Sequence, residues 1–423
     1  MSPLTEETPM PPLRWAILFL LFLAMTVNIL DRQVLSLAAP VLRDELRLSN
    51  TQYGLIVFSF LLGMTLGQVP VGMMLDRLGA RLGFPLILAW WSLANLAHAA
   101  ARSVVQFGVL RFLLGTGECG TYSAGVKVIG QWFGERERAL AAGLFNSGSL
   151  AGAILAPPLI VFLMLRFGWP AAFFVPSLAG LIWILPWLRL YWEPWRHPRL
   201  RGGTSPARVA EAPRARRSVL PLLAVPAIWG VILMRSFGGP VTHFYWYWLP
   251  EYLRRERGMS LEMIGVLAWL PFFAGGVGNI GGGWFSSALI RRGWSLDRAR
   301  KAAFLLATAL CLAAVLVPLS PNAASALTLI SLAALGINAI AANLMGLIAD
   351  LFPQGILAQV SALTGVGDGT MSMLMMLLTG VVVDRYSYLP VFFAAGLLPL
   401  LCLASLLLLV RRVRPIPLTG LYG

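Results

Sequence analysis

Long runs of apolar residues, separated by short polar segments, extend over most of this chain. A helix that crosses a bilayer needs about 20 mostly apolar residues. Twelve runs meet this requirement, at residues 15–41, 52–75, 83–101, 104–131, 139–166, 170–192, 226–252, 261–290, 301–318, 322–350, 358–383 and 388–410. The pattern therefore predicts an all-α membrane protein with twelve transmembrane helices.

The sixth and seventh runs are separated by a segment of a different kind. Residues 193–222 are rich in Pro and Arg and show no apolar periodicity, which is typical of a linker. We predict one six-helix bundle over residues 1–192, a basic linker over 193–222 and a second six-helix bundle over 223–423.

The two predicted bundles share short sequence patterns. Segments 131–148 and 350–367 place Phe, Leu and Gly at one constant offset. Segments 40–54 and 250–265 both contain a Pro, a charged stretch, a Ser and a Gly. Because parallel repeats occur in transporters that bind ligand between two bundles, we expect the bundles to be pseudo-symmetric.

The composition supports a bilayer environment. Hydrophobic residues make up 58% of the chain and charged residues 12%, whereas soluble proteins carry about 25% charged residues. The formal net charge is +15, but the basic residues lie between the apolar runs, so we expect no nucleic-acid partner. Most Lys and Arg fall in the linker, the tail and the loops of one predicted side, which indicates that both termini are cytoplasmic.

The sequence offers little for enzyme chemistry. Cys119, Cys311 and Cys402 lie inside apolar runs, without disulfide or metal-ligand spacing, and are expected as buried small side chains. The sequence contains no metal-ligand cluster, no phosphate loop after a strand and no nucleophile motif. We therefore expect no enzyme activity, no cofactor and no metal.

A polar segment between the second and third predicted helices carries regularly placed Gly and charged residues. Gly72 and Gly79 permit close helix contact and a tight turn. Asp76, Arg77 and Arg81 can form a charge network that latches one conformation, although an ordinary basic interfacial loop is the alternative. The pattern resembles the signature loop of the major facilitator superfamily, which implies that fold.

Other motifs resemble the anion:cation symporter family of that superfamily. Asp31 and Arg32 follow Asn28 as in the first-helix motif of the family, and Arg111 precedes Glu118 as in its fourth-helix motif. Further similar segments are 131–139 and 245–253, with 156–158 and 269–272 closest in appearance to hexuronate transporters. The resemblance covers nearly the whole chain and implies coupled transport of organic anions, which fits a bacterial inner membrane.

Four charged residues fall inside predicted helices, namely Asp31, Arg32, Arg111 and Glu118. A charge at the bilayer centre costs roughly 2.5–3.5 kcal/mol, so such residues face a cavity or one another. Their formal charges cancel, and we hypothesise that Asp31 pairs with Arg111 in one state while Arg32 and Glu118 point toward the substrate. The alternative is a structural ion-pair network that locks the bundle, although buried pairs are poor stabilisers.

The family resemblance implies roles for these four side chains. Asp31 and Glu118 are expected to be the proton-coupling carboxyls, and Arg32 and Arg111 their partners, with an arginine on the substrate carboxylate. When the substrate engages an arginine, the carboxyl loses its partner and takes up a proton.

Further candidates for substrate binding are Asn146, Ser149, Tyr245, Trp248, Asn279, Asn343 and Asp368. The amides and hydroxyls can bind sugar hydroxyls or can join helices, and the aromatic residues can form a cavity wall or packing. Asp368 has no basic partner nearby in the sequence. Arg235 reaches either the cavity or the membrane interface, Lys127 is expected at the interface, and His243 as a packed neutral ring.

Two positions depart from the family pattern. Ile29 stands where the family often has Tyr, and Met64 stands where an aromatic hydroxyl is common. Both changes remove sugar-binding hydroxyls and allow a smaller or more apolar carboxylate.

These observations predict a monomeric, proton-coupled symporter of a small organic anion, a sugar acid such as a hexuronate or aldonate, that works by alternating access. Sodium in place of the proton stays open. The alternatives are a drug or metabolite exporter of the same fold, and a membrane sensor, for which the linker is too short to be an effector domain.

Overall fold

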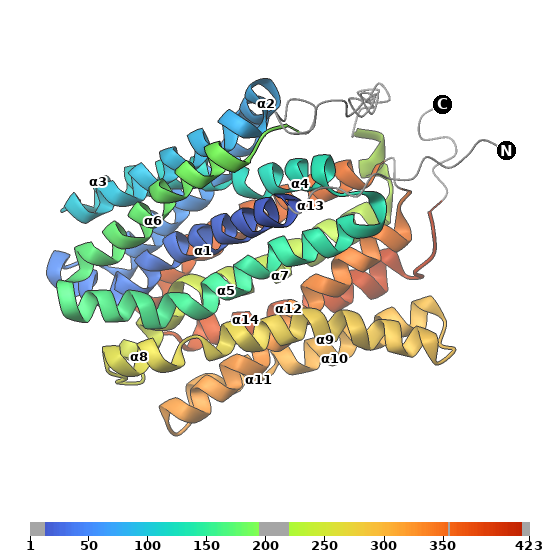
Figure 1. Ribbon diagram of the computed structural model, residues 1–423. Helices are drawn as coiled ribbons and strands as arrows, with labels where there is room; N and C mark the ends of the chain where they lie inside the picture. Colours follow the sequence, from blue (N-terminus) through green and yellow to red (C-terminus); the bar gives the residue numbers. More distant parts are fainter. Residues whose placement is uncertain (1–12, 194–219, 354–355, 417–423) are drawn as a thin grey trace.

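The computed structural model describes residues 13–193, 220–353 and 356–416, and its long elements are helices (Figure 1). Most of the predicted linker, residues 194–219, lies outside the described residues. The first half contains α1 (Leu13–Leu46), α2 (Asn50–Ala97), α3 (Val104–Glu118), α4 (Gly120–Trp132), α5 (Glu135–Phe167) and α6 (Trp169–Leu190). The second half contains α7 (Pro226–Arg255), α8 (Leu261–Leu267), α9 (Leu270–Arg291), α10 (Leu296–Cys311), α11 (Ala313–Leu316), α12 (Ala323–Leu351), α13 (Leu357–Arg385) and α14 (Leu389–Ser405).

The predicted all-helical membrane fold is confirmed. Within the described residues, nine helical segments are long and apolar enough to cross a membrane. One of them, α2, covers two predicted spans, and its 48 residues would form a straight rod about 72 Å long. Gly79, with φ 73° and ψ 170°, interrupts this helix, so that its two parts need not be collinear. The number twelve stays a prediction.

The sequence repeats correspond to matching local structure. Ser49 caps α2 with φ −71° and ψ 162°, and Ser260 caps α8 with φ −66° and ψ 159°. Each serine side chain accepts a hydrogen bond from the backbone three residues later, which satisfies a free N–H of the first turn. Phe133 and Phe352 end α4 and α12 with nearly the same extended backbone, φ −120° and −119°.

Small residues allow the helices to approach closely. A methyl group at Gly63 on α2 would overlap the carbonyl oxygen of Phe112 on α3, and one at Gly278 on α9 would overlap that of Leu335 on α12. In lipid, where apolar side chains gain little by leaving the solvent, such close backbone packing supplies much of the association between helices.

The two ends of the bundle differ in how the halves meet. We call them the Leu13 end and the Leu46 end, after the residues at which α1 begins and ends. At the Leu46 end, Arg43 pairs with Glu251, and Asp44 pairs with Arg255, so that α1 is joined to α7. These ion pairs tie the first half to the second.

Asp384 adds a second link at the Leu46 end. Its carboxylate, at the end of α13, accepts from both the backbone and side chain of Asn50 at 2.9 and 2.8 Å, and of Thr51 at 2.7 and 2.6 Å. Asp384 of the second half therefore caps the first turn of α2 in the first half. The helix dipole favours a negative charge at this position. These polar contacts join the halves at this end, which is closed in this conformation.

Candidate functional site

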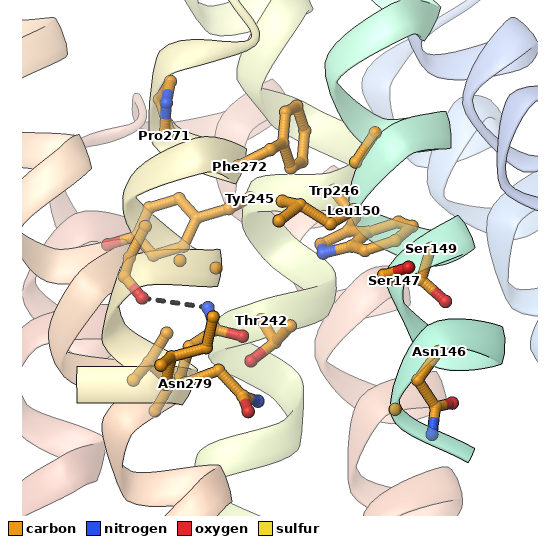
Figure 2. Close-up of a pocket in the computed structure, with 18 residues that line it drawn as sticks. Asn146, Ser147, Ser149, Leu150, Thr242, Tyr245, Trp246, Pro271, Phe272 and Asn279 are labelled. Atoms are coloured by element: carbon orange, nitrogen blue, oxygen red, sulfur yellow. Dashed lines mark hydrogen bonds between the residues drawn. The ribbon is translucent and has the colours of Figure 1, made fainter. Parts of the chain in front are cut away.

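A cavity of about 700 Å³ lies between the two halves. Its walls come from α5 of the first half and from α7, α9 and α12 of the second. Figure 2 shows Asn146 and Ser149 on α5 across the cavity from Asn279 on α9. The lining residues include none of Asp, Glu, Lys and Arg, so hydrogen bonding and apolar contact define this space.

A second cavity of about 430 Å³ adjoins the first. The two share Thr242 on α7, Asn279 on α9, and Ile337 and Asn338 on α12. The second contains charged groups, because Arg235 and Asp368 line it together with His243.

Five of the seven further candidates for substrate binding line these cavities. Asn146, Ser149 and Tyr245 line the first cavity, Asn279 lines both, and Asp368 lines the second. Tyr245 is buried, and Figure 2 shows its hydroxyl pointing away from Asn146 and Ser149, so its ring forms part of the cavity wall.

The other two predicted substrate-binding residues, Trp248 and Asn343, are packed away from both cavities. Trp248 is fully buried, with its ring 5.0 Å from that of Tyr53 in an edge-to-face arrangement. The Asn343 amide donates to Gly282 and accepts from Arg300, which joins α12 to α9 and α10. In this conformation these two side chains stabilise the contacts between helices.

The four intramembrane charges do not line either cavity. Arg32 Nε donates to Glu118 Oε2 at 3.0 Å, which joins α1 to α3. Asp31 accepts from Asn95 at 2.7 Å and from Trp91 at 3.2 Å, both on α2. Arg111 is fully buried, and its guanidinium nitrogens have no hydrogen-bond partner among the described residues.

These contacts differ from the hypothesised pairing of Asp31 with Arg111. Asp31 and Arg32 are neighbours on α1, so their side chains leave the helix about 100° apart. Arg32 turns toward Glu118, and Asp31 turns toward α2, where neutral donors satisfy it. In this conformation Glu118 thus faces Arg32 and lines neither cavity.

Sequence reasoning underestimated one face of α7. Arg235, Gly239, Thr242 and Trp246 follow one another at intervals of four, three and four residues, so they share a face, and all four line a cavity. The spacing of polar and small positions within an apolar helix was the signal that could have identified this face. Asn338 on α12 was missed as well.

The segment predicted as a latch makes its described contacts within the first half. Asp76 pairs with Lys127 on α4 at 2.9 Å, so Lys127 has a specific partner. The Arg81 guanidinium stacks 3.3 Å from the Trp192 ring centre, and its backbone N–H donates to Glu193. Gly79 supplies the positive φ that the turn requires.

The remaining members of the predicted latch are Gly72 and Arg77. A methyl group at Gly72 would meet no atom within 4 Å, and Arg77 is exposed. Within residues 13–193, 220–353 and 356–416, there is no group of three or more His, Cys, Asp or Glu side chains that could hold a metal ion.

Comparison with known proteins places this geometry in a family. A sequence profile of the Major Facilitator Superfamily matches residues 21–342. The chain is 29% identical over 403 residues to a hexuronate transporter of Escherichia coli (strain K12), covering 92% of each chain. It is 31% identical over 418 residues to a hexuronate transporter of Bacillus subtilis (strain 168), covering 95% of this chain and 94% of the relative.

A solved structure has the same fold. It is a bacterial homologue of the human lysosomal transporter Spinster in an inward-facing and occupied conformation, with a TM-score of 0.75, 19% identity and 95% coverage of both chains. The predicted family, and with it the expectation of a transporter instead of an enzyme, is confirmed. The chain is a multi-pass membrane protein that belongs to the Major Facilitator Superfamily of transporters, among relatives in its anion:cation symporter branch.

Proposed function

We propose that this protein is a proton-coupled symporter of a small organic anion, a sugar acid such as a hexuronate or aldonate. The observation that carries this proposal is the cavity between the two halves, closed at the Leu46 end and lined by neutral residues, several of which have hydrogen-bonding side chains. Rocking of the two halves about this cavity would expose it at one end and then at the other.

The lining of the first cavity suits a polyhydroxylated ligand. Asn146, Ser149, Asn279 and Asn338 offer amide and hydroxyl groups from both halves, and the Tyr245 ring adds an aromatic wall. A volume of about 700 Å³ falls within the usual range of small-molecule sites. The two relatives that carry the name hexuronate transporter support the same class of substrate.

The buried charges provide a means of proton coupling. Burial and a neighbouring guanidinium act on a carboxyl group in opposite senses, so a change of partner can load or release a proton. Glu118 is held by Arg32, while Arg111 lacks a hydrogen-bond partner in the described conformation. Asp31 and Glu118 are therefore our candidates for the proton carriers, and Arg32 and Arg111 for the cations that exchange partners during the cycle.

The predicted orientation indicates which side of the membrane each end of the bundle faces. If both termini are cytoplasmic, as the distribution of Lys and Arg indicates, the closed Leu46 end faces outward and the cavity communicates with the Leu13 end. We propose a monomer in a bacterial inner membrane, in which this conformation releases the substrate to the cytoplasm.

Proteoliposome uptake tests the proposed function. Labelled glucuronate, galacturonate, galactonate and benzoate are offered with an inward proton gradient, with a sodium gradient and with neither. Accumulation of a sugar acid that needs the proton gradient, and that an uncoupler abolishes, is the expected result. Accumulation that needs the sodium gradient would show that sodium, and not the proton, is the coupling ion. The absence of uptake of every acid under every condition would reject the proposal.

A further inference from the structure

The second cavity contains an ion pair that the proposed function leaves unused. Arg235 Nε on α7 donates to Asp368 Oδ2 on α13 at 3.2 Å. Among the described residues that line the two cavities, these two are the only Asp, Glu, Lys or Arg side chains. Because charges in a membrane protein are costly, a pair at the wall of a cavity calls for a functional explanation.

Arg235 has unused capacity to bind an anion. Its side chain is 31% exposed, and only its Nε has a hydrogen-bond partner among the described residues. The two terminal nitrogens remain free for another acceptor. A guanidinium binds a carboxylate with two parallel N–H donors, so a ligand carboxylate fits the available part of this group.

Asp368 is held at a defined position beside Arg235. Its Oδ1 accepts from Ser372 at 3.1 Å, and the Ser372 oxygen lies 3.2 Å from His243 Nδ1. Gly239 makes room for this carboxylate, because a methyl group there would overlap Asp368 Oδ1. The carboxylate therefore neutralises Arg235 when no ligand is bound.

The arginines of the first half are less accessible in this conformation. Arg32 is engaged by Glu118, Arg111 is fully buried, and neither lines a cavity. An anion in the described cavities therefore meets Arg235 first. Asn279 and Asn338 line both cavities, so one ligand can extend from Arg235 into the larger space.

We propose that Arg235 binds the carboxylate of the transported acid in the conformation closed at the Leu46 end, in competition with Asp368. The hydroxyl-bearing part of the acid then occupies the first cavity, next to Asn279 and Asn338. This inference rests on the proposed function for its class of ligand, and it assigns the orientation of that ligand.

The competition makes the charge of Asp368 decisive for binding. Asp368 lies beside Arg235 and His243 of α7 and Ser372 of its own helix, while the neighbouring side chains from α12 and α2, such as Asn338 and Thr65, are uncharged. Removal of the Asp368 charge by substitution removes the competitor of the ligand, so it should strengthen binding of the acid.

Equilibrium binding to the purified full-length protein in detergent tests the proposal. The probes are labelled glucuronate, galacturonate and galactonate, with glucuronamide as the neutral analogue. We expect Arg235→Gln to weaken binding of the acid at least tenfold, and Arg235→Lys to weaken it less, because the charge stays but the forked geometry is lost. Asp368→Asn should bind the acid at least as tightly as wild type because the competing charge is absent, and Gly239→Ala should resemble it by displacing the carboxylate.

A matched control comes from a second Arg–Asp pair in the same half. Arg300 on α10 pairs with Asp350 on α12 at 2.8 Å, away from both cavities. Arg300→Gln should leave the affinity for the acid within a factor of two. Size-exclusion profiles establish that each variant is folded before its affinity is compared.

The outcomes separate this inference from the proposed function. Equal affinity of wild type and Arg235→Gln, equal binding of glucuronate and glucuronamide, or no binding of any of the three acids would overturn the inference. Loss of binding in Arg235→Gln, together with no proton-driven uptake by wild type, would support the site and reject symport. Normal uptake by Arg235→Gln would support symport and reject the site.

Discussion

Arg32 Nε lies 3.0 Å from Glu118 Oε2, and this ion pair connects α1 to α3 inside the first half. The Glu118 side chain is fully buried, whereas 18% of the Arg32 side chain is exposed. The arginine is therefore the more accessible member of the pair, so in the proposed cycle a competing anion would separate the pair at Arg32.

The first prediction concerns this carboxyl group. Glu118→Gln should lower proton-driven accumulation of the acid at least tenfold, because an amide cannot carry a proton, while exchange of labelled for unlabelled acid persists. Proteoliposome uptake and counterflow measure the two activities. Glu137→Gln is the matched control, since Glu137 forms an ion pair with Arg14 away from both cavities. Normal pH-dependent accumulation by both Glu118→Gln and Asp31→Asn would refute the coupling assignment.

A second prediction concerns closure of the Leu46 end. Asp384→Ala removes the acceptor of four hydrogen bonds to Asn50 and Thr51, so the closed state should become less populated. Ser36 is 1% exposed and donates to the backbone of Trp246 in the other half, which makes Ser36→Cys a reporter. We expect this cysteine to react several-fold faster with a bulky maleimide in the Asp384→Ala background.

The control for this measurement is Asp297→Ala. Asp297 also accepts from a backbone N–H and from a side chain, those of Val413 and Lys301, but at the Leu13 end. The reactivity of the reporter should not rise in this background. Equal rates in all three proteins would show that Asp384 does not hold the end closed.

A third prediction concerns recognition of hydroxyl groups. Asn146→Ala and Ser149→Ala each remove a cavity-lining hydrogen-bonding group, which is worth about 1 kcal/mol, or roughly fivefold in affinity. KM for the acid should rise by that factor in each variant. Ser331→Ala is the control, because Ser331 donates to its own helix outside both cavities. An unchanged KM in both test variants would show that Asn146 and Ser149 do not bind the hydroxyl groups of the acid.

A fourth prediction concerns close helix packing. A methyl group at Gly63 would overlap the backbone of Phe112, so Gly63→Ala should destabilise the protein by about 1–3 kcal/mol. Thermal unfolding in detergent measures the loss. Gly130→Ala is the matched control, since Gly130 also lies in a helix but has no atom within 4 Å of the added methyl group. Its unfolding temperature should stay the same or rise, because Ala favours helix. Equal destabilisation of the two variants would contradict the packing argument.

The sequence carried enough information to predict the fold. Apolar runs and the repeated segments depend on neighbouring residues, so local patterns reveal them. The predicted spans correspond to described helices, and the Ser49 and Ser260 caps repeat with nearly equal backbone angles. The turn at Gly79 was likewise expected from its place in a short polar segment.

The candidate site was predicted only in part. Which side chains pair with one another depends on how each helix is rotated about its own axis, and the sequence does not give that rotation. Asp368 had no basic residue nearby in the sequence, and its partner Arg235 lies 133 residues away on another helix. The direction in which Asp31 points was also undetermined, since both α2 and α3 offered polar partners. Periodicity identifies a face of one helix, whereas the neighbour of that face follows from tertiary packing.

The ion pairs described here also determine how the membrane potential acts on the transporter. Asp31, Arg32, Arg111 and Glu118 carry no net formal charge as a group, and neither does the pair of Arg235 with Asp368. Moving one elementary charge through 100 mV changes the energy by about 2.3 kcal/mol. An empty carrier that rocks with these groups moves no net charge through that field, and a carrier loaded with one proton and one monoanion moves none either. Transport of one proton with one monoanion should therefore produce almost no electrical current, and the resting voltage of the cell should neither speed nor slow it.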